Sequence, residues 1–131
     1  MSKPEETLAF LLNHSGIEYK REYRFAAHHV GMGKGIRGRL QNAGLKDWRA
    51  DFLVSDWLLV EVEGITHYGR NRNGTMRLGR HQTAKGIEDD LRKYDAAMRL
   101  GYTVYRCSQY MVKSGRALET IKILLEQRHA N

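Results

Sequence analysis

The sequence has a single cysteine, Cys107, and a single proline, Pro4, among 131 residues. One thiol excludes an internal disulfide and any cysteine-based zinc cluster, and its apolar surroundings predict a buried, inert side chain. We therefore expect a reducing, cytoplasmic setting. No apolar run approaches the ~20 residues of a membrane-spanning helix, and the N-terminus lacks the apolar core of a signal peptide. These absences predict a protein without a membrane partner.

Acidic residues are missing from one long stretch, since none lies between Glu63 and Glu88. Uncompensated positive charges repel one another unless phosphates lie nearby. The asparagines and glycines of residues 64–86 predict a loop that becomes ordered on nucleic acid, although a long loop can also be idle. The candidate contacts in this stretch are Arg70, Arg72, Arg77, Arg80, His81 and Lys85.

Positive charge also dominates the chain as a whole. Its 22 Lys and Arg against 15 Asp and Glu give a net charge of +7, and the pI is about 9.7. A small basic domain suggests a polyanionic partner, most simply nucleic acid, although ribosome or membrane-surface binding would give the same value. Residues 26–47 lack periodicity and predict a second flexible basic loop, which either follows a phosphate backbone or is solvated. Its candidate contacts are Lys34, Arg37 and Arg39.

The remaining segments predict one domain over residues 1–131, of the α/β class. A helix is expected from Pro4 to about residue 14, a strand over 17–25, and a hairpin of strands before and after Ser55-Asp56. An amphipathic helix follows over 87–100, then a strand over 102–107 and a last helix over 114–127. The order α-β-β-β-α-β-α predicts a mixed central β-sheet flanked by helices, with the 102–107 strand parallel to the 58–62 strand.

The central hairpin carries three carboxylates. Asp51 lies in the first strand, and Glu61 and Glu63 close the second. Residues two apart in a strand point to the same face, so these glutamates repel one another unless a positive charge lies between them. Hard oxygen ligands suit magnesium, manganese or calcium. The alternative is that both glutamates face solvent at the end of the strand.

Several motifs, taken in order, resemble the PD-(D/E)xK nuclease superfamily. The segment VEVEGITH, ending at His67, is similar to the EvDGxxH signature of very-short-patch mismatch repair endonucleases and their small relatives. The resemblance runs from Lys3 to about Ile121. It includes Lys3-Pro4-Glu5, Asp51, Gly79-Arg80-His81, Asp90 with Lys93, and Gly101-Tyr102 leading to Val104-Tyr105-Arg106.

This resemblance implies a single nuclease-like domain with a restriction-endonuclease-like core, and DNA cleavage that depends on Mg²⁺ or Mn²⁺. It implies that Asp51 and Glu61 hold the metal, joined by Glu63 or by the carbonyl of Val62. It also implies that Glu5 reaches the metal site from the first helix. Glu5 is equally suited to a capping box, and its neighbour Glu6 is the substitute candidate.

The chain departs from the superfamily motif at one position. Where a lysine usually follows two residues after the second acid, this chain has Glu63. Either Lys93, matched in the related small nucleases, or His67 is then the candidate for proton transfer, because an unperturbed histidine has a pKa near ~6.5. The alternatives are a surface salt bridge for Lys93 and a packing or DNA-contact role for His67. We expect Asp90 to position the lysine.

Three functions follow from these features. The first is a metal-dependent DNA endonuclease that is specific for a DNA structure or lesion and acts in junction resolution, recombination or repair. The small nucleases that the chain resembles often occur in phage. The second is a non-catalytic nucleic-acid-binding module on a nuclease-like fold. The third is an RNA-processing or ribosome-associated protein. Symmetric junction cutting or double-strand cleavage would favour a homodimer.

Overall fold

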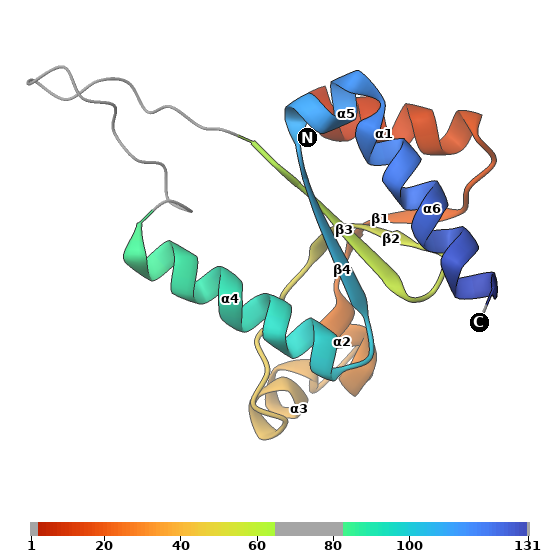
Figure 1. Cartoon of the computed structure of the whole chain (residues 1–131). Coiled ribbons are helices and arrows are strands. Elements are labelled where there is room, and N and C mark those ends of the chain that lie inside the picture. The colour runs from red at the N-terminus through yellow and green to blue at the C-terminus, as the bar shows by residue number, and fades with distance from the viewer. Residues whose placement is uncertain (1–2, 65–82, 131) are drawn as a thin grey trace, which may run out of the picture. The chain divides into compact units, whose positions relative to one another are not determined.

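The computed structural model describes residues 3–64 and 83–130, which contain both helices and strands (Figure 1). The predicted roles of His67, Arg70, Arg72, Arg77, Arg80 and His81 therefore lie outside the described residues. No helix in the described ranges is long and apolar enough to cross a membrane. The elements are α1 (Lys3–His14), β1 (Tyr19–Tyr23), α2 (Phe25–Val30), α3 (Ile36–Asn42), β2 (Ala50–Val54), β3 (Leu58–Glu63), α4 (Ala84–Arg99), β4 (Thr103–Ser108), α5 (Gln109–Ser114) and α6 (Arg116–Ala130).

The four strands form one sheet in the order β1-β2-β3-β4. β1 pairs antiparallel with β2, and β2 with β3. β4 follows the helical crossover α4 and runs beside β3 in the same direction (Figure 1). The sheet is therefore mixed and flanked by helices, which confirms the predicted fold class, the central hairpin and the neighbour of the last strand.

The chain divides into two compact units. The first holds α1, β1, β2, β3, α5, α6 and most of β4. The second comprises residues 24–49 and 65–104, and so holds α2, α3, α4 and the beginning of β4. The candidate carboxylates at positions 5, 51, 61 and 63 all belong to the first unit, and Lys93 belongs to the second.

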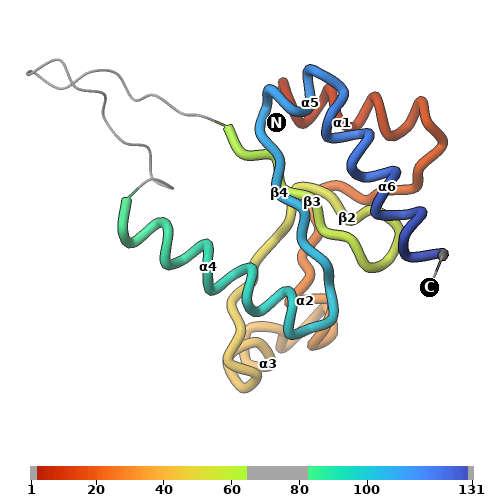
Figure 2. The backbone as a smooth tube through the Cα atoms, viewed as in Figure 1, coloured from red at the N-terminus to blue at the C-terminus, as the bar shows by residue number. Residues whose placement is uncertain are grey.

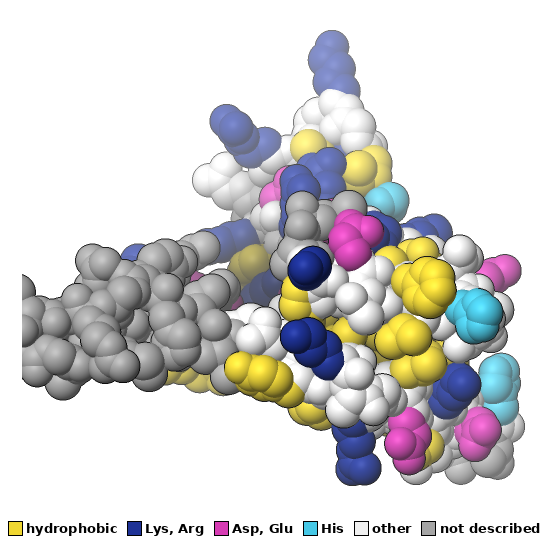
Figure 3. Space-filling model, turned by 90° about the horizontal axis from the view of Figure 1, so that it is seen from above, with side chains coloured by type: hydrophobic (Ala, Val, Ile, Leu, Met, Phe, Trp, Pro, Cys, Tyr) yellow, Lys and Arg dark blue, Asp and Glu magenta, His cyan; other side chains and the backbone are white. Residues whose placement is uncertain are grey.

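The core of the first unit lies between the sheet and the helices α1, α5 and α6, which are grouped together in Figures 1 and 2. Leu8 and Leu12 of α1 and Ile121 of α6 are fully buried with Phe52 and Val60 of the sheet. Helical and strand periodicity thus aim apolar side chains at one shared layer. The face seen in Figure 3 is mixed, with Lys and Arg side chains scattered among hydrophobic and acidic ones.

Residues 26–47 are not a flexible loop, so that prediction was wrong. Phe25, Ala26 and Ala27 are buried in α2, and Leu40 is buried in α3. Short helices of one or two turns give too few periodic positions to be recognised in a sequence. The glycines between α2 and α3 make a defined turn: Gly31, Gly33 and Gly35 have positive φ angles of 102°, 99° and 85°.

Arg39 closes this turn rather than extending into solvent. Its guanidinium donates to the carbonyl of Gly31 at 2.6 Å and to that of Lys34 at 2.8 Å. Weaker contacts reach the carbonyls of Met32 and Gly33 at 3.3 and 3.4 Å. The guanidinium therefore satisfies carbonyls that short helices leave without partners. Lys34 and Arg37 are exposed.

Helix boundaries differ from prediction at two further places. α4 begins at Ala84, because the Thr83 hydroxyl caps it by accepting from the N–H of Gly86 at 3.1 Å. Lys85 is therefore helical, and its ammonium pairs with Asp89 at 3.1 Å. Ser114, the predicted cap of the last helix, is the last residue of α5; α6 begins at Arg116, whose N–H donates to the Ser114 hydroxyl at 3.4 Å.

The apolar stripe of α4 is more exposed than its spacing indicates. Of the four residues at helical intervals, only Tyr94 is buried. Ile87, Leu91 and Met98 are 47%, 55% and 57% exposed. Ala97 and Gly86 are buried instead. The buried face of α4 therefore includes these small residues and differs from the predicted apolar stripe.

Candidate functional site

Asp51 lies at the centre of the candidate site, on β2, the second strand of the sheet. It is half-buried beside the fully buried Phe52. Its Oδ2 accepts a hydrogen bond from the N–H of Val62 on β3, at 2.8 Å. This bond fixes the carboxylate against the hairpin, so that its orientation is set by the strand pairing rather than by side-chain freedom.

The strand register aligns two further acids with Asp51. Arg21 pairs with Phe52 and Tyr23 with Ala50, so Glu22 on β1 lies opposite Asp51. Phe52 pairs with Val60 on β3, and continuing this register places Glu61 opposite Asp51 on the other side. Cross-strand partners share a face of the sheet. Three neighbouring strands therefore contribute one carboxylate each at the same level.

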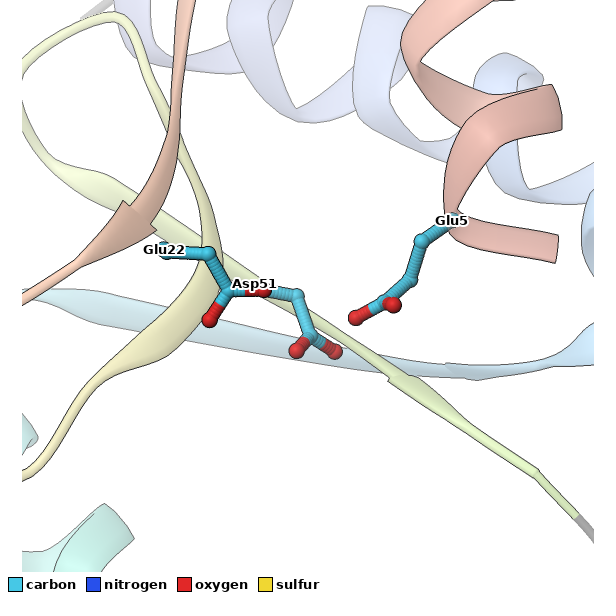
Figure 4. A group of neighbouring side chains, drawn as sticks. All are labelled: Glu5, Glu22 and Asp51. Carbon is cyan, nitrogen blue, oxygen red and sulfur yellow. The ribbon is translucent and has the colours of Figure 1, made fainter. Parts of the chain in front are cut away.

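A fourth carboxylate comes from the first turn of α1. Glu5, Glu22 and Asp51 each offer a carboxylate oxygen, and these oxygens all lie within 4.8 Å of one another. Figure 4 shows Glu5 projecting from α1 toward the carboxylate of Asp51, with Glu22 beside it. Glu6 does not belong to this group, since its Oε1 pairs with Arg21 Nη2 at 3.3 Å. Glu5, rather than its neighbour, therefore lies among the clustered carboxylates.

The cluster is electrostatically unfavourable without a cation. Glu61 is only 7% exposed and is the one buried charged residue of the described ranges. The pKa of Asp51 is raised well above its ordinary value, first by burial and then by a hydrogen bond with Glu5. The charge of Glu61 and a hydrogen bond with that residue raise it further, whereas the hydrogen bond from the Val62 N–H lowers it. Carboxylates that share a site in this way favour a bound proton or a bound metal ion.

Glu63 lies farther along β3 and has a partner of its own. Its Oε1 accepts from Arg106 Nε on β4 at 3.1 Å, with both side chains partly exposed. Cys107, next on β4, is buried and donates from its Sγ to the carbonyl of Glu61 at 3.6 Å. Burial and the charges of Asp51, Glu63 and Glu61 raise the pKa of Cys107 to about 12. The thiol is therefore buried, as predicted, and protonated.

The residues predicted to replace the motif lysine do not lie in the unit that holds the carboxylates. Lys93 and Asp90 belong to α4 of the second unit, where the Lys93 ammonium lies 5.6 Å from the Tyr94 ring centroid. His67 lies outside the described residues. Their predicted catalytic roles remain predictions.

Sequence reasoning missed Glu22. It lies in the strand that was predicted, and it is an acid in a segment where acids are poor strand formers. Its φ of 49° is in the left-handed region that non-glycine residues rarely adopt. Neither the register with β2 nor this conformation is visible in the sequence, because β1 and β2 are separated by α2 and α3.

Comparison with known proteins supports the fold. No family model matches the chain, and no protein of curated function matches it in sequence. Among solved structures, the fold is similar to that of the homing endonuclease I-Bth0305I catalytic domain, with a TM-score of 0.51. The match covers 97% of this chain and 93% of that one at 15% sequence identity. The chain therefore has the fold of a nuclease catalytic domain.

Proposed function

We propose that this chain is a metal-dependent DNA endonuclease whose first unit hydrolyses phosphodiester bonds at Glu5, Glu22, Asp51 and Glu61. The observation that carries the proposal is the convergence of carboxylate oxygens from α1, β1 and β2 within 4.8 Å. Like charges gathered on a rigid sheet are costly, and a divalent cation removes that cost. The nuclease-type fold supports the same conclusion.

The donor set fits a hard cation. Carboxylate oxygens are the ligands that Mg²⁺ and Mn²⁺ take in proteins, and Glu5, Glu22 and Asp51 would hold the ion, with Glu61 as a fourth ligand or as a partner of Asp51. This assignment keeps Asp51 and Glu61 from the sequence prediction and adds Glu22. Glu63 is less suited to binding the ion, because Arg106 already pairs with its carboxylate.

Different residues of this chain would bind the metal ion, orient the carboxylates and transfer the proton. A bound Mg²⁺ supplies a polarised phosphoryl oxygen and a more acidic water. The Val62 N–H holds Asp51 in one orientation, and Glu5 approaches from a separate element. Arg106 places a positive charge beside Glu63, at the position of the missing motif lysine, and neutralises that carboxylate. Lys93 or His67 handles the proton, since a guanidinium stays protonated.

The test is cleavage of labelled single strands, duplexes, flaps and four-way junctions with Mg²⁺, Mn²⁺ or EDTA. Asp51→Asn and Glu5→Gln should abolish metal-dependent cutting. Their matched controls are Asp56→Asn, an exposed aspartate in the β2–β3 turn, and Glu6→Gln, the neighbour that pairs with Arg21. No cleavage of any substrate with either metal, or equal loss in the controls, would refute the proposal.

DNA is the proposed substrate, and a structure or lesion within it is the proposed target, as in junction resolution, recombination or repair. The basic residues of the second unit support a nucleic-acid partner, and among them Lys34 and Arg37 are exposed. We also propose cytoplasmic action, consistent with a single buried thiol. A homodimer would follow if junctions are cut symmetrically, which sedimentation of the DNA complex measures.

A binding module without cleavage is the second candidate. It is favoured by one observation: Glu63, paired with Arg106, occupies the position where the motif has a lysine. Tight DNA binding that is insensitive to EDTA, with no cutting under either metal, would select this candidate. Loss of cutting in Lys93→Ala with DNA binding retained would instead identify the displaced lysine.

A further inference from the structure

Positive charge is divided unequally between the two units. The first unit contains 8 Lys and Arg against 10 Asp and Glu, and the second contains 14 against 5. Their net charges are therefore −2 and +9, which together give the +7 of the chain. Because the carboxylate cluster belongs to the acidic unit, affinity for a polyanion must come mainly from the second unit.

The second unit contains a groove between the α2–α3 region and the C-terminal half of α4, which pass beside each other in Figures 1 and 2. Its volume is about 550 Å³, which lies within the range of ligand sites in proteins. Trp48 lines it together with cationic side chains and one acid. The ionisable lining residues are His29, Lys46, Arg92, Arg99 and Asp95.

The indole of Trp48 packs against a buried aromatic ring. It stacks on the buried ring of Phe25 with centroids 6.3 Å apart and planes inclined by 10°. The Tyr102 ring packs against the Phe25 ring in an edge-to-face arrangement, with centroids 6.0 Å apart. The segment before Trp48 is fixed by Asp47, whose carboxylate accepts from Arg24 at 3.0 and 2.6 Å. A half-buried aromatic side chain in such a frame is a pre-organised stacking surface.

The combination of groups in this groove matches a nucleotide. An aromatic ring offers a face on which any base can stack, and lysine and arginine side chains beside it attract the phosphates on either side. A base inside a duplex already has a neighbour on each face, so stacking on a protein ring would first require the duplex to unstack locally. Trp48 with Lys46 and Arg99 therefore fits an unpaired strand better than an intact duplex.

We propose that this groove binds an unpaired nucleotide of the DNA substrate, with its base on Trp48 and its phosphates near Lys46 and Arg99. The proposal extends the proposed function by naming a feature of the substrate, a single-stranded segment at a junction, flap or lesion. It concerns residues outside the carboxylate cluster, so it can fail or hold independently of cleavage.

The test uses the intrinsic fluorescence of Trp48 in the full chain. The second tryptophan, Trp57, lies in the first unit under Arg128, whose guanidinium is 4.5 Å from its ring. Trp57→Phe therefore leaves Trp48 as the sole reporter. This protein is titrated in EDTA, which prevents cutting, with oligo(dT), a blunt duplex, oligo(rU), dTMP and inorganic phosphate.

Oligo(dT) should quench Trp48 and bind about tenfold or more tightly than the duplex. Lys46→Glu with Arg99→Glu should weaken oligo(dT) binding about tenfold or more and reduce its salt dependence. Trp48→Phe should retain most of the affinity, and Trp48→Leu should lose it; because both variants lack the reporter, their binding is measured by the fluorescence anisotropy of labelled oligo(dT). The matched control is Lys122→Glu on α6 of the first unit, an exposed lysine of the same charge, which should change neither quantity.

Four results would overturn the proposal: no change in Trp48 emission with oligo(dT), equal quenching by the duplex, dTMP or phosphate as effective as the oligonucleotide, or a marked preference for oligo(rU). Thermal melts separate a folding defect in Trp48→Leu from a binding defect. Metal-dependent cutting without quenching would support the nuclease proposal and refute nucleotide binding in the groove. Quenching without cutting of any substrate would support nucleotide binding in the groove and refute the nuclease proposal.

Discussion

Glu22 and Asp51 lie opposite each other on β1 and β2, in the register set by Arg21 with Phe52 and Tyr23 with Ala50. Two like charges in facing positions destabilise a sheet, and here a third acid, Glu5, lies within 4.8 Å of both. The backbone of Glu22 has a φ of 49°, a conformation that costs about 1–3 kcal/mol. Repulsion and strain in one place are typical of functional sites.

Glu22→Gln should reduce metal-dependent cleavage by about 10²-fold or more, since a ligand to a catalytic metal is worth several kcal/mol. Its removal should leave DNA binding unchanged, because the second unit carries the positive charge. Glu18→Gln, an exposed glutamate just before β1, serves as the control. Single-turnover cleavage rates measure the effect, and a wild-type rate in Glu22→Gln would exclude this residue from the site.

Asp51→Asn should make the metal-free protein more stable, because the raised pKa of Asp51 makes folding depend on proton uptake, which the neutral amide does not need. We expect a gain of the order of 1 kcal/mol, or about 3–5 °C in Tm. Mg²⁺ should raise the Tm of the wild-type protein and not that of the variant. Thermal melts in EDTA and in Mg²⁺ provide both quantities, with Asp56→Asn as the control; a variant less stable than wild type in EDTA contradicts the repulsion.

The Arg24–Asp47 pair should make stability depend on pH in the acidic range. The hydrogen bond from Arg24, with the charges of Arg24 and Arg49, lowers the pKa of Asp47 despite some burial. A lowered pKa contributes stability above the unfolded value near ~3.9, and this contribution is lost as the pH falls through the folded value.

Asp47→Asn should therefore lower the free energy of unfolding at pH 7 and have a smaller effect at pH 3. Urea denaturation at both pH values checks the difference against Asp56→Asn. An equal loss at the two pH values would show that the pair contributes through packing rather than charge. Since Asp47 precedes Trp48, weakened quenching of Trp48 by oligo(dT) should accompany the loss at pH 7.

Arg39 and Arg37, two residues apart on α3, should behave differently. Arg39→Ala removes the donors for the carbonyls of Gly31 and Lys34 and should cost about 1–3 kcal/mol of stability. Arg37→Ala is exposed and should leave stability unchanged while weakening DNA binding and its salt dependence. Chemical denaturation and binding at two salt concentrations distinguish them; a stable Arg39→Ala protein would contradict the structural role.

Local pattern was sufficient for much of the fold. The hairpin follows from a short turn between two strongly apolar runs, and β3 begins at the predicted Leu58 and ends at Glu63, one residue beyond the predicted strand. The β3–β4 neighbour relation follows from the helical crossover between them. The short helices α2, α3 and α5 could not be predicted, because six or seven residues give hardly two turns of periodicity.

The site was predictable in part for a similar reason. Asp51 and Glu61 stand in one hairpin, where the turn fixes their register, so sequence spacing brings them together. Glu22 reaches the same place only through the pairing of β1 with β2, which 26 residues of helix and loop separate along the chain. Glu63 shares a strand face with Glu61, but its partner Arg106 comes from β4, and no spacing rule predicts that contact.

Whether Glu5, Glu22 and Asp51 hold a divalent cation can be seen in a crystal of the protein grown with Mn²⁺. Manganese is located by its anomalous scattering, independently of any cleavage assay. We predict one strong anomalous peak coordinated by oxygens of these three carboxylates, and its loss in Asp51→Asn but not in Asp56→Asn. A protein without a peak at this cluster, or with manganese bound only at Glu63, would contradict the account.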